Sequence, residues 1–234
     1  MARKPSRRRP SKRPALPPPA GGDRERIIQV FMQLLAEKRL ERIDLSEVAK
    51  RAGVSLARLR EQFGSPLSIL AAHMKNIDRA VLDGGDADMA KEPPRDRLFD
   101  VLMRRLEALA PQKAAVRSLM RSSMCNPGLA LALTGLGVRS MRWMLIAAGI
   151  NTSGARGAFR AQGTALIFAR VLRVWVDDDD PGFARSMAEL DRALASGQNW
   201  SRLLDDLCAV IPTLRPRRRR RRARGGEADE AAAA

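Results

Sequence analysis

The amino-acid sequence predicts an all-α protein with two domains. Ala, Leu, Arg and Met dominate the 234 residues, and all four residue types favour helices. Apolar residues also recur at helical spacing along most of the chain. Hydrophobic residues make up 45% of the sequence, and a chain of this length can bury a sizeable core. We therefore expect a globular body built from packed helices.

Two strongly basic segments flank that body. Residues 1–22 contain seven Lys and Arg and no acidic residue, and residues 215–234 contain eight Arg against three acidic residues. They carry most of the formal net charge of +17. Because both are too polar to bury a core, we expect residues 1–22 to be a disordered basic arm and residues 213–234 to be a disordered Arg-rich tail. Such tails bind polyanions non-specifically. They either raise affinity for DNA through counterion release or reflect only a biased composition.

The first domain, expected at residues 23–82, begins with an amphipathic helix over residues 23–38. A second helix follows Asp44, an N-cap residue that has Glu47 at the spacing of a capping box. That helix ends at Gly53, where a positive φ is favourable. The apolar face of the first helix comprises Ile27, Phe31 and Leu34.

Two more helices complete the first domain. Ser55 is placed to cap the third helix, whose Leu59 and Phe63 point inward. Ser65 and Pro66 start the fourth helix, because Pro is well tolerated at the first helical position. A short helix, a tight turn and a second short helix are typical of a helix-turn-helix unit, in which the second helix enters a DNA groove.

The third helix is the candidate element for reading DNA. Its outward side chains include two Arg, which can hydrogen-bond guanine O6 and N7, and one Gln, which can read adenine. The alternative is a solvated charged face on an ordinary three-helix bundle. The residues expected to contact double-stranded DNA are Ser55, Leu56, Arg58, Arg60 and Gln62.

The second domain is expected at residues 95–212, after a linker at residues 83–94. It contains an acidic run at residues 177–180, which we interpret as a helix stop and a solvated cap. Its helices are expected at residues 95–109, 113–124, 129–148, 158–176, 183–195 and 200–211.

Methionine and aromatic side chains of the second domain are candidates for the lining of an apolar pocket. Flexible Met and flat Trp suit a greasy small molecule or a lipid. The alternatives are plain core packing or, for exposed aromatic residues, contact with a membrane surface. The candidates are Met141, Trp143, Met144, Phe168, Trp175 and Trp200.

The sequence gives little support to an enzyme, a cofactor or a metal site. It has no phosphate-cradling Gly loop, no nucleophile elbow and no cluster of metal ligands. Cys125 and Cys208 are expected to be buried, and His73 to lie at the surface or at a domain interface. Arg139 and Arg142 lie in the most apolar stretch, which favours a core helix over a membrane span. We expect a cytoplasmic protein.

Residues 24–82 resemble the N-terminal domain of TetR-family transcriptional regulators. The resemblance rests on the first-helix pattern, on "LSEVAKRAGVS", on a short helix ending at Phe63, and on the helix start at Ser65–Leu70. It implies a homodimer that places two recognition helices in successive major grooves. It also implies a larger, variable helical domain that binds a small ligand and dimerises, with residues 158–176 and 200–211 as the dimer helices.

Several positions depart from the pattern of that family, which typically has Gly-Thr, Leu-Tyr, a His before the Phe, and a Lys at the head of the fourth helix. The family's Tyr and Lys commonly contact phosphates. Arg60 can replace the Tyr electrostatically, whereas Pro66 cannot replace the Lys, and Glu61 would repel a nearby phosphate. The corresponding residues are Ala57, Arg58, Leu59, Arg60, Gln62 and Pro66.

The C-terminal half is also similar to the lipid-binding ubiquinone-biosynthesis protein that shares the TetR fold. That resemblance implies binding of an isoprenoid lipid and assistance to a quinone hydroxylase, without DNA binding. The sequence therefore predicts a ligand-responsive DNA-binding regulator, with the lipid-binding accessory protein as the alternative. The segments that carry this resemblance are residues 97–109, 139–150 and 171–194.

Overall fold

The computed structural model describes residues 22–85 and 88–196, which form helices joined by short connections and contain no strand. The prediction of an all-α protein is confirmed. The expected helix at residues 200–211, most of both basic tails, Trp200 and Cys208 lie outside the described residues.

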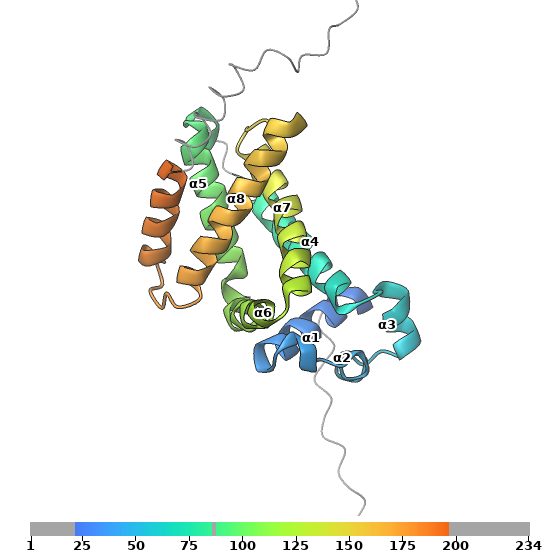
Figure 1. Ribbon diagram of the computed structural model, residues 1–234. Helices are drawn as coiled ribbons and strands as arrows, with labels where there is room; N and C mark the ends of the chain where they lie inside the picture. Colours follow the sequence, from blue (N-terminus) through green and yellow to red (C-terminus); the bar gives the residue numbers. More distant parts are fainter. Residues whose placement is uncertain (1–21, 86–87, 197–234) are drawn as a thin grey trace, which may run out of the picture. The chain divides into compact units, whose positions relative to one another are not determined.

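Eight helices are labelled in Figure 1, and a further helix runs from residue 184 to the end of the described part at residue 196. Short 3-10 turns lie at Leu40–Arg42, Asp88–Lys91 and Ala110–Gln112. The helices are α1 (Asp23–Glu37), α2 (Leu45–Ala52), α3 (Leu56–Gln62), α4 (Pro66–Asp83), α5 (Pro94–Leu109), α6 (Lys113–Cys125), α7 (Pro127–Ala147) and α8 (Gly154–Trp175).

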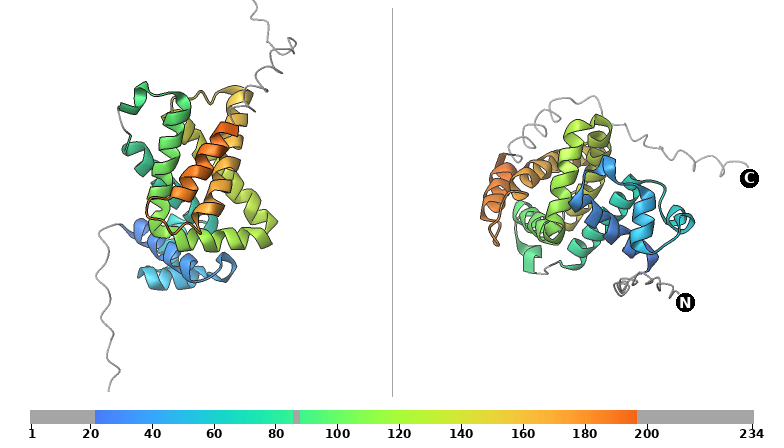
Figure 2. Two further views of the ribbon diagram at one scale, coloured as in Figure 1. Left: turned by 90° about the vertical axis from the view of Figure 1, so that its left-hand side faces the viewer. Right: turned by 90° about the horizontal axis from the view of Figure 1, so that it is seen from below.

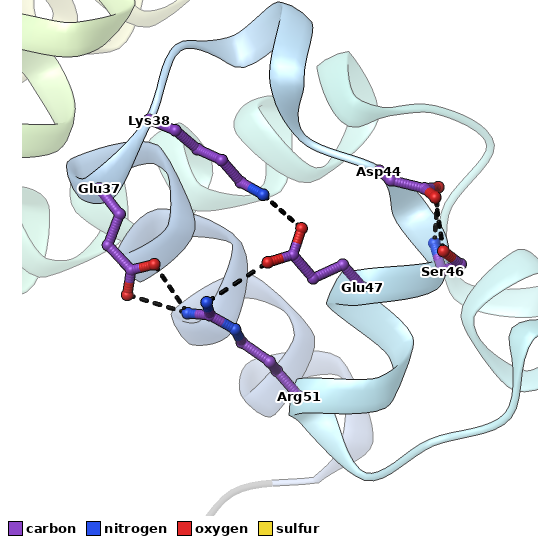
Figure 3. Close-up of polar contacts among 6 residues, drawn as sticks. All are labelled: Glu37, Lys38, Asp44, Ser46, Glu47 and Arg51. Carbon is purple, nitrogen blue, oxygen red and sulfur yellow. Dashed lines mark hydrogen bonds and ion pairs between the residues drawn. The ribbon is translucent and has the colours of Figure 1, made fainter.

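Local side-chain chemistry explains where α2 begins and ends. The Asp44 carboxylate accepts a hydrogen bond from the Ser46 backbone N–H, which satisfies one free donor at the helix start. Gly53 ends the helix with φ at +66°, a conformation that other residues rarely adopt. The expected capping box is wrong, because the Glu47 carboxylate is engaged by Lys38 and Arg51 instead (Figure 3).

The starts of α3 and α4 follow the same chemistry. The Ser55 hydroxyl accepts a hydrogen bond from the Arg58 backbone N–H, at 3.1 Å. At α4, Ser65 and Ser68 each accept from the other's backbone N–H, so a capping box forms two helices later than expected. Pro66 occupies the first turn, where the missing N–H costs nothing.

The described residues contain two apolar cores, and α4 contributes to both. The first core joins α1, α2 and α3 with the beginning of α4, through side chains such as Phe31, Leu59 and Ile69. The second joins the end of α4 with α5, α7, α8 and the helix at 184–196. Burying each large apolar side chain stabilises the fold by about 1.5–3 kcal/mol. Helix α6 packs along α1, and its Ala115 belongs to the first core (Figures 1 and 2).

The structure corrects the expected placement of three side chains. Cys125 is exposed at the end of α6, where the helix turns into Asn126. His73 is buried in α4, which rules out the surface placement, while a place at a domain interface stays a prediction. Asp178 is also buried, because its carboxylate accepts hydrogen bonds from both the backbone N–H and the hydroxyl of Ser186.

Helix α7 is long and apolar enough to cross a membrane by length and composition, and 22% of its most apolar stretch is buried. Its C-terminal half packs into the second core through Met141, Met144 and Leu145. Arg139 and Arg142 lie at exposed positions of the same half. The apolar character of α7 therefore serves core packing on one side and leaves apolar side chains exposed on the other.

Candidate nucleic-acid interface

Helix α3 has one anchored face and one exposed face. Leu59 and Phe63 are 2% and 3% exposed and insert into the first core. On the other side, Leu56 is 56% exposed, and Arg58 and Arg60 are also exposed. A recognition helix needs such a division, because one face must hold it in place while the other contacts the groove.

The five residues expected to contact DNA are therefore not equivalent. Leu56 offers an apolar surface of the kind that contacts a thymine methyl group. Ser55 is exposed, but its hydroxyl already caps α3. Gln62 is half-buried, and its backbone carbonyl accepts a hydrogen bond from Arg24 at 3.3 Å. Arg60 has no carboxylate partner among the described residues, so it is the better placed of the two Arg to contact phosphate.

Ion pairs link α2 to the end of α1, as Figure 3 shows. Arg51 donates to both carboxylate oxygens of Glu37, each at 2.9 Å, and pairs with Glu47 at 3.3 Å. Glu47 also pairs with Lys38, the residue that follows α1. The hydrogen bond from Arg51 is the main reason that the pKa of Glu37 lies below its ordinary value. Partly exposed pairs of this kind add little stability, and they link α2 to the end of α1.

Arg58, a predicted reader, is held by two carboxylates. Its Nε donates to Asp23 Oδ2 at 2.9 Å, and its Nη1 donates to Glu61 Oε2 at 2.9 Å. The hydrogen bond from Arg58 is the largest cause that lowers the pKa of Asp23, and Arg26 adds to it. The pairing of Asp23 with Arg58 cannot be predicted from the sequence, because the two lie 35 residues apart and no local pattern links them.

A second contact joins the start of α1 to the end of α3. The Arg24 guanidinium lies over the Phe63 ring, 4.6 Å from its centroid. Because Arg24 also donates to the Gln62 carbonyl, the first turn of α1 is fixed against α3 at two points. The neighbouring Asp23 thus lies at the exposed face of α3, where it accepts a hydrogen bond from Arg58.

In the second core, the structure separates the predicted pocket residues into two groups. Trp143 is 51% exposed on α7 and does not join the others. The other predicted pocket residues within the described part of the chain pack in one core cluster rather than around an opening. The members of that cluster are Met141, Met144, Phe168 and Trp175.

A buried polar cluster connects α4, α5 and α7 inside the second core. The Asp78 carboxylate accepts hydrogen bonds from Arg105 and from the Ser140 hydroxyl. The Arg105 guanidinium also lies 5.5 Å from the centroid of the Phe168 ring. Burial lowers the pKa of Arg105, although Asp78 opposes that shift. Burial likewise lowers the pKa of His73, and the positive charge of Arg105 adds to the effect.

An open groove of about 550 Å³ lies between α5 and the helix at residues 184–196. Its apolar lining includes Phe99, Met103 and Met187. Its acidic lining includes Asp96 and Asp191. Among the predicted pocket residues that the structure describes, none lines this groove.

No family model and no curated protein matches the sequence. Solved structures do match. A TetR transcriptional regulator from Nitrosomonas europaea has a TM-score of 0.59 and 21% identity, and the match covers 74% of this chain and 96% of that chain. A TetR transcriptional regulator from Rhodococcus sp. RHA1 has a TM-score of 0.51 and 26% identity, covering 74% and 94%. A TetR-family regulator from Streptomyces coelicolor has a TM-score of 0.51 and 16% identity, covering 80% and 85%. This chain has the TetR-like fold, in agreement with the resemblance seen in residues 24–82.

Proposed function

We propose that this protein is a transcriptional regulator that binds double-stranded DNA in the cytoplasm through α3. The observation that carries the proposal is the two-sided character of α3: Leu59 and Phe63 anchor it, while Leu56, Arg58 and Arg60 remain exposed. An Arg pair beside an exposed Leu combines hydrogen-bond donors for guanine with an apolar contact for thymine. The TetR-like fold of the chain supports the same function.

The regulator acts as a homodimer in this proposal. Large apolar side chains are exposed on α7 and α8, including Phe159 at 68% and Leu166 at 59%. Phe159 and Leu166 are seven residues apart, so they share one face of α8, and Trp143 and Ile146 share one face of α7. Apolar surface of this kind marks an interaction site on a soluble protein. Two copies related by a two-fold axis would cover it and would present two α3 helices to DNA half-sites about 34–36 Å apart, or a multiple of that distance.

The second core is the proposed site of ligand response. Helix α4 belongs to both cores, so a ligand that shifts it changes the position of the recognition helix that precedes it. The ligand is an apolar small molecule that inserts among Met141, Met144 and Phe168, next to the ion pair of Arg105 with Asp78. Trp175 belongs to the same core, so its fluorescence reports ligand entry.

Sequencing of captured DNA tests the regulator proposal. The full chain is mixed with genomic fragments at ~150 mM salt, near physiological ionic strength, and the retained fragments are sequenced. We expect enrichment of one palindromic site. The matched control is the double variant Arg58→Ala/Arg60→Ala, which keeps both basic tails. If the control retains the same fragments as the natural chain, the tails rather than α3 bind the DNA.

A separate measurement, of lipid bound to the purified protein, tests the lipid-binding alternative. Organic extraction of the purified full chain, followed by mass spectrometry, measures any bound isoprenoid lipid. A stoichiometric isoprenoid, together with no enriched DNA site, would replace the regulator proposal by the accessory role in quinone biosynthesis.

A further inference from the structure

The hydrogen bonds of Arg58 leave part of its guanidinium free. An arginine side chain has five N–H donors: one on Nε and two on each terminal nitrogen. Asp23 occupies the donor on Nε, and Glu61 occupies one donor on Nη1. One donor on Nη1 and both donors on Nη2 therefore remain. Guanine O6 and N7 together require two donors, so the paired Arg58 retains enough for a bidentate contact.

The two carboxylates restrain Arg58 from different elements. Glu61 lies one turn further along α3, whereas Asp23 is the first residue of α1. The first turn of α1 is itself fixed to α3, because Arg24 stacks on Phe63 and donates to the carbonyl of Gln62. Arg58 is 49% exposed, so these restraints set the direction of a long side chain that would otherwise sample many rotamers.

We propose that Asp23 and Glu61 determine base specificity, by holding Arg58 with its outer N–H donors directed at a guanine in the major groove. This inference rests on the proposed DNA-binding function of α3. Asp23 and Glu61 are positioning residues, and Arg58 is the residue that touches the base. Restraining the side chain before DNA arrives removes part of the entropy cost of forming the correct contact.

The same carboxylates lower the affinity for DNA of any sequence, although they raise the preference for one base. Their negative charges lie beside Arg58, and they repel nearby phosphates. The arrangement therefore lowers non-specific affinity while it raises the preference for one base. This combination distinguishes positioning from simple masking, in which Asp23 and Glu61 only compete with DNA for Arg58. Under masking, removing a carboxylate raises the affinity for all sequences equally.

Selection from a pool of duplexes with a randomised central region tests the inference on the full chain at ~150 mM salt. Four proteins are compared: the natural chain, Arg58→Ala, Asp23→Asn and the matched control Glu37→Gln. The control also removes an exposed carboxylate that accepts from an Arg of the same unit, Arg51, but it leaves Arg58 untouched. Both basic tails are present in all four proteins, so their contribution cancels.

The natural chain is expected to enrich a palindrome with a guanine at one position of each half-site. Arg58→Ala should reduce the preference for that guanine about 5- to 150-fold, the range for loss of a bidentate contact. Asp23→Asn should reduce the preference at the same position about 2- to 10-fold, as expected when the charge-assisted hydrogen bond to Arg58 is replaced by a weaker one to a neutral amide. It should also bind a scrambled duplex more tightly than the natural chain. Glu37→Gln should keep the natural preference.

Two results would overturn the inference, and they separate it from the proposed function. If the natural chain enriches a palindrome and Asp23→Asn keeps the full guanine preference, Asp23 has no positioning role, while DNA reading by α3 stands. If the natural chain enriches nothing, the proposed function fails and the inference fails with it. Adding Asp23→Asn to Arg58→Ala completes the test, because positioning requires that the combined variant lose no further base preference.

Discussion

The helix-turn-helix unit and the α7–α8 pair differ in the exposure of their large apolar side chains. In α1, α2 and α3 the large apolar residues are buried or half-buried, apart from Leu56 on the exposed face of α3. In α7 and α8, exposed residues such as Leu131, Trp143 and Phe159 alternate with buried ones. The first region completes its core within one chain, whereas the second exposes apolar surface that a second copy would cover. The two properties proposed for this chain, DNA reading and dimer formation, therefore rest on different helices.

The largest expected effect on stability comes from truncating a buried side chain of the first core. Phe31 is fully buried, so Phe31→Ala should lower the free energy of unfolding by about 3–5 kcal/mol. Trp143→Ala, at an exposed position, should change the stability of the isolated subunit by less than about 0.5 kcal/mol. Urea denaturation of both variants measures the difference. Equal losses would show that Trp143 is packed and that the comparison is wrong.

Dimer formation is expected to depend on the exposed residues of α8. Leu166→Asp places a charge on the proposed interface, and it should weaken dimerisation at least about tenfold, or about 1.4 kcal/mol. Sedimentation equilibrium measures the effect. Met187→Asp is the control, because Met187 is exposed on the helix at residues 184–196 and not on α8. A natural chain that sediments as a monomer would contradict the proposed homodimer.

A smaller effect should appear in the dependence of stability on pH. Burial holds the pKa of His73 below its ordinary value of 6.5, with Arg105 adding to the shift and Glu25 opposing it. As the pH falls below about 6.5, the unfolded chain binds the proton first, so the free energy of unfolding decreases. His73→Leu should flatten this decrease. Thermal melting at several pH values checks it, and identical curves for the two proteins would show that His73 ionises freely in the fold.

The smallest effect is expected at the contact between α1 and α2. Glu47→Gln removes the carboxylate that pairs with Lys38 and Arg51, and it should lower the melting temperature only slightly at low salt. The difference should vanish in ~1 M salt, where the screening length is about 3 Å. A difference that persists at high salt would mean that Glu47 acts through packing or hydrogen bonding rather than through charge.

The helix boundaries of the first half could be predicted because their causes are local. Asp44, Ser55 and Ser65 each accept a hydrogen bond from a backbone N–H two or three residues later, and this spacing is visible in the sequence. The role of Glu47 could not be predicted in the same way. One of its partners, Lys38, lies nine residues earlier, and only the packing of α2 on α1 brings the two together.

The candidate site was only partly predictable for a related reason. Apolar periodicity placed Leu59 and Phe63 inside and left Arg58 and Arg60 outside. It could not show that Asp23 holds Arg58, because that pair joins the ends of two separate helices.

Helix α7 posed a different difficulty for sequence analysis. It has apolar residues on every side, so periodicity alone does not decide which of them face the core. The structure buries Met144 and exposes its neighbour Trp143. A helix with apolar residues all round thus has to be placed by its packing partners.

Hydroxyl-radical footprinting of the full chain on its enriched duplex tests the central claim, that two α3 helices of a dimer read DNA, most directly. The expected result is two protected segments whose centres lie about one helical turn apart, 34–36 Å, or a multiple of it. Both should be lost together in Arg58→Ala/Arg60→Ala, although that variant retains its basic tails. A single continuous footprint that is unchanged in the double variant would contradict the claim and would assign DNA binding to the tails.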